Sequence, residues 1–121
     1  MAFPLLKLIV LRTHRLEEMK TFYEMLGIRF VEEQSGKGPV RYVGAIGSAV
    51  LELTPRTKGE APVEHSVRLG FAVSNLGNIA MELGSTGIRI GPSERNSPVV
   101  VIKDPDGRVV ELTQETRPIS S

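Results

Sequence analysis

The feature that most constrains the fold of this chain is an internal repeat with a shift of about sixty residues. The triplet Gly-Ile-Arg at 27–29 recurs at 87–89, and the triplet Glu-Leu-Thr at 52–54 recurs at 111–113. A duplication of this length predicts two copies of one supersecondary unit. Each copy alone is too small to bury its apolar faces well, so the two are expected to form one domain over residues 1–121.

Both copies carry the same order of predicted elements: one strand, one helix and three strands. In the first copy the strands are expected at 5–11, 28–31, 40–46 and 48–53, and the helix at 16–26. In the second copy the strands are expected at 67–73, 88–90, 99–103 and 108–113, and the helix at 76–83. Period-2 and helical apolar spacing support these assignments. The predicted fold class is therefore α+β, built from two βαβββ modules.

Turn residues mark the ends of these elements. Gly27 suits the left-handed stop of the first helix, and Thr13 or His14 is a suitable cap for its start. Gly47, and the turn Asp-Pro-Asp-Gly at 104–107, are expected to close hairpins. Module 1 is expected at about 4–54, a linker at 55–66, module 2 at about 67–114 and a tail at 115–121.

Strand alternation separates the residues that face each helix from those that face away. Leu51 and Leu53 in the first copy, like Val110 and Leu112 in the second, are expected under the helix. The glutamates between them, Glu52 and Glu111, then point to the opposite face. The repeat adds Leu8 and Arg68 from the first strands as the matching positions on that face, and Arg12 shares the strand face of Leu8.

Composition excludes several classes of function. Fifteen basic and fourteen acidic residues give a net charge of +1 without a long basic run, which argues against a nucleic-acid partner. No cysteine is present, so disulfides and thiolate metal sites are excluded, and a reducing cytoplasmic location is expected. No apolar stretch approaches the roughly 20 residues of a membrane span, so no membrane association is expected.

Three segments together resemble the vicinal oxygen chelate superfamily. They are the Phe-Tyr-Glu-Met-Leu-Gly helix end at 22–27, Leu-Glu-Leu at 51–53, and the 104–107 turn before Val-Glu-Leu at 110–112. The superfamily includes glyoxalase I, bleomycin-resistance proteins, fosfomycin-resistance enzymes and extradiol dioxygenases. The resemblance implies two βαβββ modules whose mixed sheets curl into a cup, with the helices on the convex side. It also implies a homodimer.

In metal-using members of this superfamily, the first and fourth strands of each module supply the ligands of a divalent ion. The positions that match in this chain are Leu8, Glu52, Arg68 and Glu111. Leu8 cannot coordinate a metal, and the cationic Arg68 would repel one. No metal cofactor is therefore expected. If a divalent ion does bind, Glu52 and Glu111 are its expected ligands.

The residues of this face have three readings, which stay open at this point. Arg68 could neutralise one or both glutamates in a buried structural network. It could instead fix a ligand carboxylate or phosphate while a glutamate, Glu111 by preference, serves as a catalytic base. A metal on the two glutamates is the third. The candidate ligand-binding residues are Arg68, Glu52, Glu111 and Arg12, of which Arg12 could either line the mouth of the cup or face water.

Three functional hypotheses follow from these readings. The first is a metal-independent protein that binds a small organic molecule, with anionic molecules among the candidates, in the manner of the bleomycin-resistance branch. The second is a metal-dependent glyoxalase-like lyase, isomerase or dioxygenase. The third is a non-catalytic structural or interaction protein. Whether the chain is an enzyme stays open in the sequence.

Overall fold

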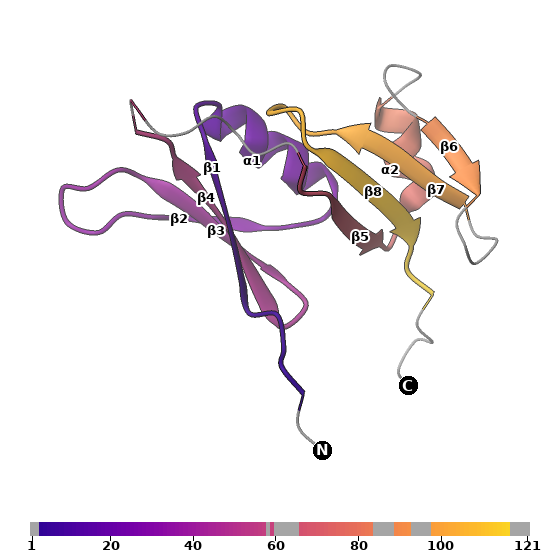
Figure 1. The fold of residues 1–121 in the computed structure, drawn as a ribbon, viewed down its shortest axis with the longest axis horizontal. Coiled ribbons are helices and arrows are strands. Elements are labelled where there is room, and N and C mark those ends of the chain that lie inside the picture. Colours follow the sequence, from indigo (N-terminus) through magenta and orange to yellow (C-terminus); the bar gives the residue numbers. More distant parts are fainter. Residues whose placement is uncertain (1–2, 58, 60–65, 84–88, 93–97, 117–121) are drawn as a thin grey trace. The chain divides into compact units, whose positions relative to one another are not determined.

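The computed structural model describes residues 3–57, 59, 66–83, 89–92 and 98–116, and these form two helices and eight strands. In chain order the elements are β1 (Leu8–Thr13), α1 (Leu16–Met25), β2 (Phe30–Glu33), β3 (Arg41–Ile46), β4 (Ala49–Pro55), β5 (Leu69–Val73), α2 (Leu76–Leu83), β6 (Arg89–Pro92), β7 (Pro98–Lys103) and β8 (Val109–Gln114). The chain divides into two compact units, Met1–Val63 and Glu64–Ser121 (Figure 1). Each unit has the order strand, helix and three strands, so the predicted α+β fold with two βαβββ modules is confirmed.

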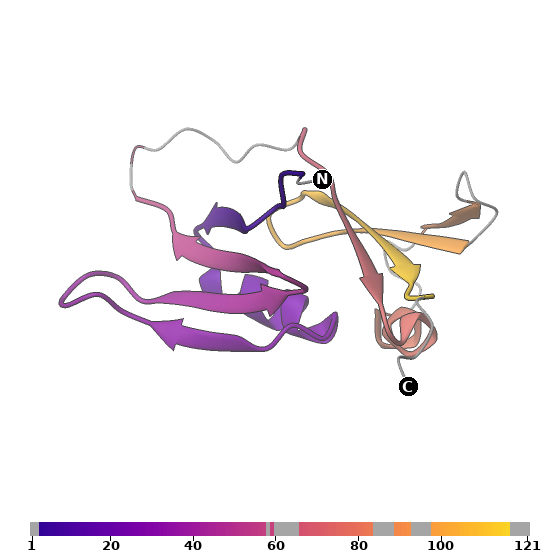
Figure 2. The ribbon, with the colours of Figure 1, turned by 90° about the horizontal axis from the view of Figure 1, so that it is seen from below.

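Both units build the same four-stranded mixed sheet. The strand order is β1-β4-β3-β2 in the first unit and β5-β8-β7-β6 in the second. The first strand of each unit pairs in parallel with the fourth, and the other pairings are antiparallel. Helix α1 packs against β4, and α2 packs against β8 (Figures 1 and 2). Each sheet therefore has one face covered by its own helix and one face without a helix from its own unit.

Local contacts fix both helix starts and the end of α1. No side chain caps α1 at Arg15, but the hydroxyl of Thr13 accepts a hydrogen bond from the Arg15 amide at 2.9 Å. Gly27 follows α1 with a φ of 109°, the left-handed conformation that the sequence predicted. Helix α2 begins with the Leu76 amide donating to the side-chain oxygen of Gln114 at 3.0 Å. That contact ties the start of α2 to the end of β8.

The core of each unit lies between the sheet and its helix. In the first unit the buried apolar residues are Leu11, Met19, Tyr23, Leu26, Ile28, Tyr42, Ala49, Leu51 and Leu53. In the second unit they are Val73, Leu76, Ile79, Val100, Ile102, Val110 and Leu112. The two leucines of β4 and the Val-Leu pair of β8 are fully buried, as alternation predicted. None of the helices in the described part of the chain is long and apolar enough to cross a membrane.

Several element boundaries differ from the predictions. Strand β1 starts at Leu8, not at residue 5, because its partner β4 starts at Ala49 and the ladder begins with Leu8 beside Val50. Strand β5 starts at Leu69, so Arg68 precedes the strand. Strand β2 starts two residues later than predicted, at Phe30. Strand β6 extends to Pro92, two residues past its predicted end, and β7 starts one residue early, at Pro98.

The predicted linker at 55–66 and tail at 115–121 lie mostly outside the described residues. At their inner limits, β4 extends to Pro55 and β8 ends at Gln114. The histidine at 65 also lies outside the described residues. The prediction that both units belong to a single domain stays a prediction.

Candidate functional site

The helix-free face of the first sheet is organised around Glu52 of β4. Leu51 and Leu53 on either side are fully buried under α1, whereas the Glu52 side chain lies on the opposite face and is 24% exposed. The ladder places Val10 of β1 and Val43 of β3 directly beside Glu52. The carboxylate therefore lies between two apolar neighbours.

Three rows of side chains cross this face. The apolar row is Leu8, Val50 and Ala45; the middle row is Val10, Glu52, Val43 and Val31; and the polar row is Arg12, Thr54, Arg41 and Glu33. Several apolar members are open to solvent, with exposures of 54% for Leu8, 40% for Val10 and 64% for Val31. The face thus changes from apolar to charged along the direction of β4.

Glu52 is held by two neighbours from the polar row. The Thr54 hydroxyl donates a hydrogen bond of 2.7 Å to Glu52 Oε2, and Arg41 Nε lies 3.7 Å from Oε1. Arg41 also contacts Glu33 Oε1 at 3.2 Å and donates to Ser35 Oγ at 3.4 Å. Its buried Nε has no hydrogen-bond acceptor among the described residues. Arg41 is therefore a counter-charge that Glu52 shares with Glu33, and strand alternation alone did not predict this contact.

The second sheet carries a similar pair made from different positions. Gly70 of β5 and Val101 of β7 lie beside Glu111 of β8. Arg68, just before β5, forms an ion pair between its Nη2 and Glu111 Oε1. The two side chains are 62% and 36% exposed. The structure thus brings Arg68 and Glu111 together, but their pair is half-exposed and is not the buried network that was one of the three possibilities.

Three other polar residues of the first unit are not members of these ion pairs. Arg12 is exposed on β1, on the strand face of Leu8, and His14 is exposed before α1. Tyr42 lies on the helix side, where its hydroxyl donates to Glu17 of α1. This hydrogen bond and, to a lesser extent, burial raise the pKa of Tyr42 to about 12. Tyr42 therefore joins α1 to the sheet and does not belong to the helix-free face.

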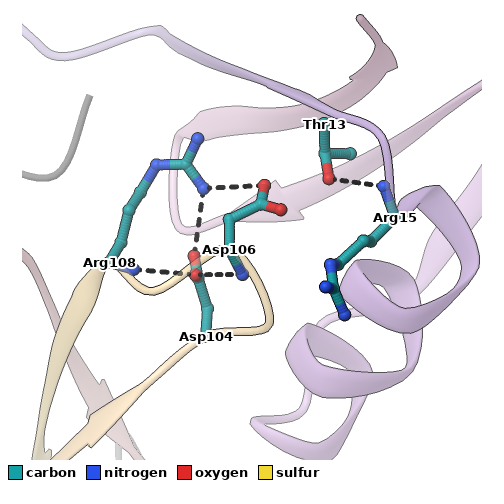
Figure 3. A network of polar contacts seen from close by, with 5 residues as sticks. All are labelled: Thr13, Arg15, Asp104, Asp106 and Arg108. Atoms are coloured by element: carbon teal, nitrogen blue, oxygen red, sulfur yellow. Dashed lines mark hydrogen bonds and ion pairs between the residues drawn. The ribbon is translucent and has the colours of Figure 1, made fainter. Parts of the chain in front are cut away.

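The turn between β7 and β8 contains a charged network that the sequence analysis missed (Figure 3). Asp104 Oδ1 accepts hydrogen bonds from the amides of Asp106 at 2.9 Å and Arg108 at 3.0 Å. Arg108 Nη1 lies 3.2 Å from Asp104 Oδ2 and 3.3 Å from Asp106 Oδ2. Asp104 and Arg108 are both buried. The alternating Asp104, Asp106 and Arg108 were the available signal, and their contacts fix the start of the strand that carries Glu111.

The carboxylates of the two sheets do not fit a divalent metal ion. One oxygen of Glu52 accepts the Thr54 hydroxyl and the other faces Arg41, while Glu111 is paired with Arg68. The first-strand positions matched to metal ligands are Leu8 and Arg68, which donate nothing to a cation. Over the described ranges, no three His, Cys, Asp or Glu side chains are grouped as metal ligands.

Comparison with known proteins adds the family context. The sequence-family model of the glyoxalase/bleomycin resistance protein/dioxygenase superfamily matches residues 5–112 of this chain. A search of curated proteins finds no match. A bleomycin-binding protein solved with bleomycin is 19% identical with a TM-score of 0.60, over 94% of this chain and 100% of that one.

Two further solved structures share the fold. TnmS3, an antibiotic-binding protein from Streptomyces sp. CB03234, is 24% identical with a TM-score of 0.66, over 96% of this chain and 99% of that one. Lactoylglutathione lyase from Agrobacterium tumefaciens is 17% identical with a TM-score of 0.61, over 91% and 92%. The TM-scores show that these proteins share the fold. At identities this low, the ligand of this chain has to be inferred from its own residues.

Proposed function

Because the chain belongs to the glyoxalase/bleomycin resistance protein/dioxygenase superfamily, we propose that it binds a small organic molecule on a helix-free sheet face without a metal ion. The observation that carries this proposal is the pairing of each glutamate with an arginine of its own unit. Glu52 faces Arg41, and Glu111 is paired with Arg68. A divalent ion at either carboxylate would lie beside an arginine guanidinium and would be repelled by it.

Arg68 is the proposed anchor for an anionic group of the ligand. Exposed ion pairs contribute only about 0–1 kcal/mol, so a ligand carboxylate or phosphate can replace Glu111 at little cost. A guanidinium matches the planar geometry of such groups through two parallel hydrogen bonds. Two structural neighbours, one bleomycin-binding and one antibiotic-binding, support the choice of aromatic antibiotics as the first ligands to test.

The metal-free part of the proposal is tested by elemental analysis of protein purified without chelator. We expect no stoichiometric metal, and no rise in Tm when zinc, nickel or manganese is added, because ligands stabilise only the state that binds them. A stoichiometric metal that is lost in Glu52→Gln or Glu111→Gln would refute this part. That result would favour the metal-dependent lyase, isomerase or dioxygenase chemistry.

The binding part is tested by a thermal-shift screen of aromatic antibiotics and anionic metabolites. A ligand at 100 times its Kd stabilises a protein by about 2.7 kcal/mol, which corresponds to a Tm rise of roughly 8–15 °C for a chain of this size. We expect Arg68→Ala to reduce the shift for anionic ligands. The control Arg29→Ala removes an exposed arginine that precedes β2. Equal ligand-induced Tm shifts in Arg68→Ala and Arg29→Ala would refute a role for Arg68 in ligand binding.

Further properties remain part of the proposal. The use of Glu111 as a catalytic base and of Arg12 as a ligand contact are both testable by substitution once a ligand is known. The family resemblance supports a homodimer, which sedimentation equilibrium measures directly. The cysteine-free composition supports a cytoplasmic location, which fractionation of the source cells would check.

A further inference from the structure

The free oxygen of Glu52 is the strongest unassigned feature of the first sheet. Oε2 is occupied by the Thr54 hydroxyl, whereas Oε1 accepts no hydrogen bond from the described residues and lies 3.7 Å from Arg41 Nε. That distance is too long for a hydrogen bond. Glu52 therefore presents one oriented acceptor at the boundary between the middle row and the polar row.

The surroundings of this oxygen restrict what it can accept. Val10 and Val43 lie on either side of Glu52 and leave little polar competition along the middle row. In the polar and middle rows together, the two arginines balance the two glutamates, so the face has no excess charge to attract an ion. A carboxylate in such surroundings selects an uncharged O–H or N–H donor over a second anion.

We infer that Glu52 is a specificity-determining acceptor that binds a hydroxyl or N–H group of the ligand, while the apolar body of the ligand lies over Leu8 and Val10 of the neighbouring strand. The inference rests on the proposed function and adds the chemical class of the ligand: an apolar, aromatic-sized body that carries an uncharged hydrogen-bond donor. Thr54 is a positioning residue, because its hydroxyl fixes the orientation of the carboxylate. Arg41 limits the negative charge at the same oxygen without occupying it.

Two fluorescent probes separate the donor from the apolar body. Naphthol and methoxynaphthalene, substituted at the same ring position, share the ring system, but only naphthol donates a hydrogen bond. Hydrogen bonds to charged acceptors are the stronger class, so we expect naphthol to bind about tenfold more tightly. Fluorescence titration of the complete chain gives both dissociation constants, and their ratio does not depend on the folded fraction of a variant.

Four variants locate the preference. Glu52→Leu should bring the ratio to about one, and Thr54→Val should lower it in part, with Thr54→Ser restoring it. Leu8→Ser should weaken both probes equally, because it removes apolar contact and not the acceptor. The control Glu18→Gln changes an exposed glutamate on α1, which covers the other face, and should leave both constants unchanged.

The outcomes distinguish this inference from the proposed function. Equal binding of both probes, or a naphthol preference that survives in Glu52→Leu, refutes the acceptor role and leaves small-molecule binding intact. Failure of both probes to bind up to their solubility refutes binding on this face and, with it, the acceptor role. A ratio that collapses in Glu52→Leu, falls in Thr54→Val and is kept in Thr54→Ser supports both.

Discussion

Replacing Asp104 with alanine tests whether buried charge holds the turn between β7 and β8. The Asp104 carboxylate accepts two backbone amides and faces the Arg108 guanidinium at 3.2 Å. The two side chains are 0% and 6% exposed. The substitution therefore removes the side-chain acceptor of two amides and one of the two carboxylates that contact the buried Arg108 guanidinium.

The expected loss follows from burial more than from distance. At an effective dielectric constant near 20, two unit charges 3.2 Å apart attract by about 5 kcal/mol, part of which offsets their desolvation. Removing one partner of a buried pair costs about 3–5 kcal/mol, because the remaining charge stays buried. Asp104→Asn keeps an oxygen for the backbone amides and should lose roughly 1–3 kcal/mol.

The Arg15–Glu18 pair provides a matched control. Its atoms are 3.4 Å apart, nearly the same distance, but the side chains are 58% and 63% exposed. Glu18→Ala should change stability by no more than about 0.5 kcal/mol. Urea unfolding followed by circular dichroism measures both losses, and hydrogen exchange of the β7 and β8 amides shows whether the loss is local.

Two results would contradict this reasoning. A loss below about 1 kcal/mol for Asp104→Ala would mean that water reaches the network and replaces the carboxylate. Equal losses in Asp104→Ala and Glu18→Ala would mean that the distance between the charges, and not their burial, sets the energy.

Two further predictions concern the first sheet. With Tyr23 replaced by phenylalanine, ultraviolet titration should give Tyr42, the remaining tyrosine, a pKa of about 12. Glu17→Gln should lower this pKa toward the usual value of 10. Because the raised pKa favours the neutral phenol in the folded state, the contribution of Tyr42 to stability is complete below pH 10 and is lost as pH rises through 12. A Tyr42 pKa that Glu17→Gln leaves unchanged would refute Glu17 as the cause of the raised pKa. Gly44→Ala should lower the free energy of unfolding by about 1–3 kcal/mol, because the added Cβ would lie 2.9 Å from the Arg29 carbonyl oxygen. In the control Gly70→Ala, the nearest described atom to the added Cβ is 3.9 Å away, so the free energy of unfolding should change by no more than about 1 kcal/mol. Urea unfolding measures both changes.

The repeat in the sequence predicted the fold because equivalent residues of the two copies occupy equivalent positions in two sheets of the same topology. The shift that matches 52–54 with 111–113 also matches the ladders, since Glu52 lies beside Val10 and Glu111 beside Gly70. Alternation then correctly separated the buried leucines from the glutamates. Boundaries were less accurate where an apolar run continues past the end of its partner strand. The exposed residues before Leu8 are the clearest case.

The missed contacts depend on relations across strands that simple periodicity does not contain. Arg41 reaches Glu52 because the hairpin at Gly47 sets the register of β3 on β4, which places Arg41 diagonal to the carboxylate. Counting outward from Gly47 would have given this neighbour. Arg68 was matched to Glu111 by the repeat, but its exposure depends on the late start of β5, which no residue pattern marked.

Each unit supplies the counter-charge of its own glutamate: Arg41 for Glu52 and Arg68 for Glu111. Neither carboxylate therefore depends on the other unit for its counter-charge. The first half can emerge from the ribosome with the charge of Glu52 already balanced, before any residue of the second half exists. At these two positions electrostatics imposes no order on the folding of the halves.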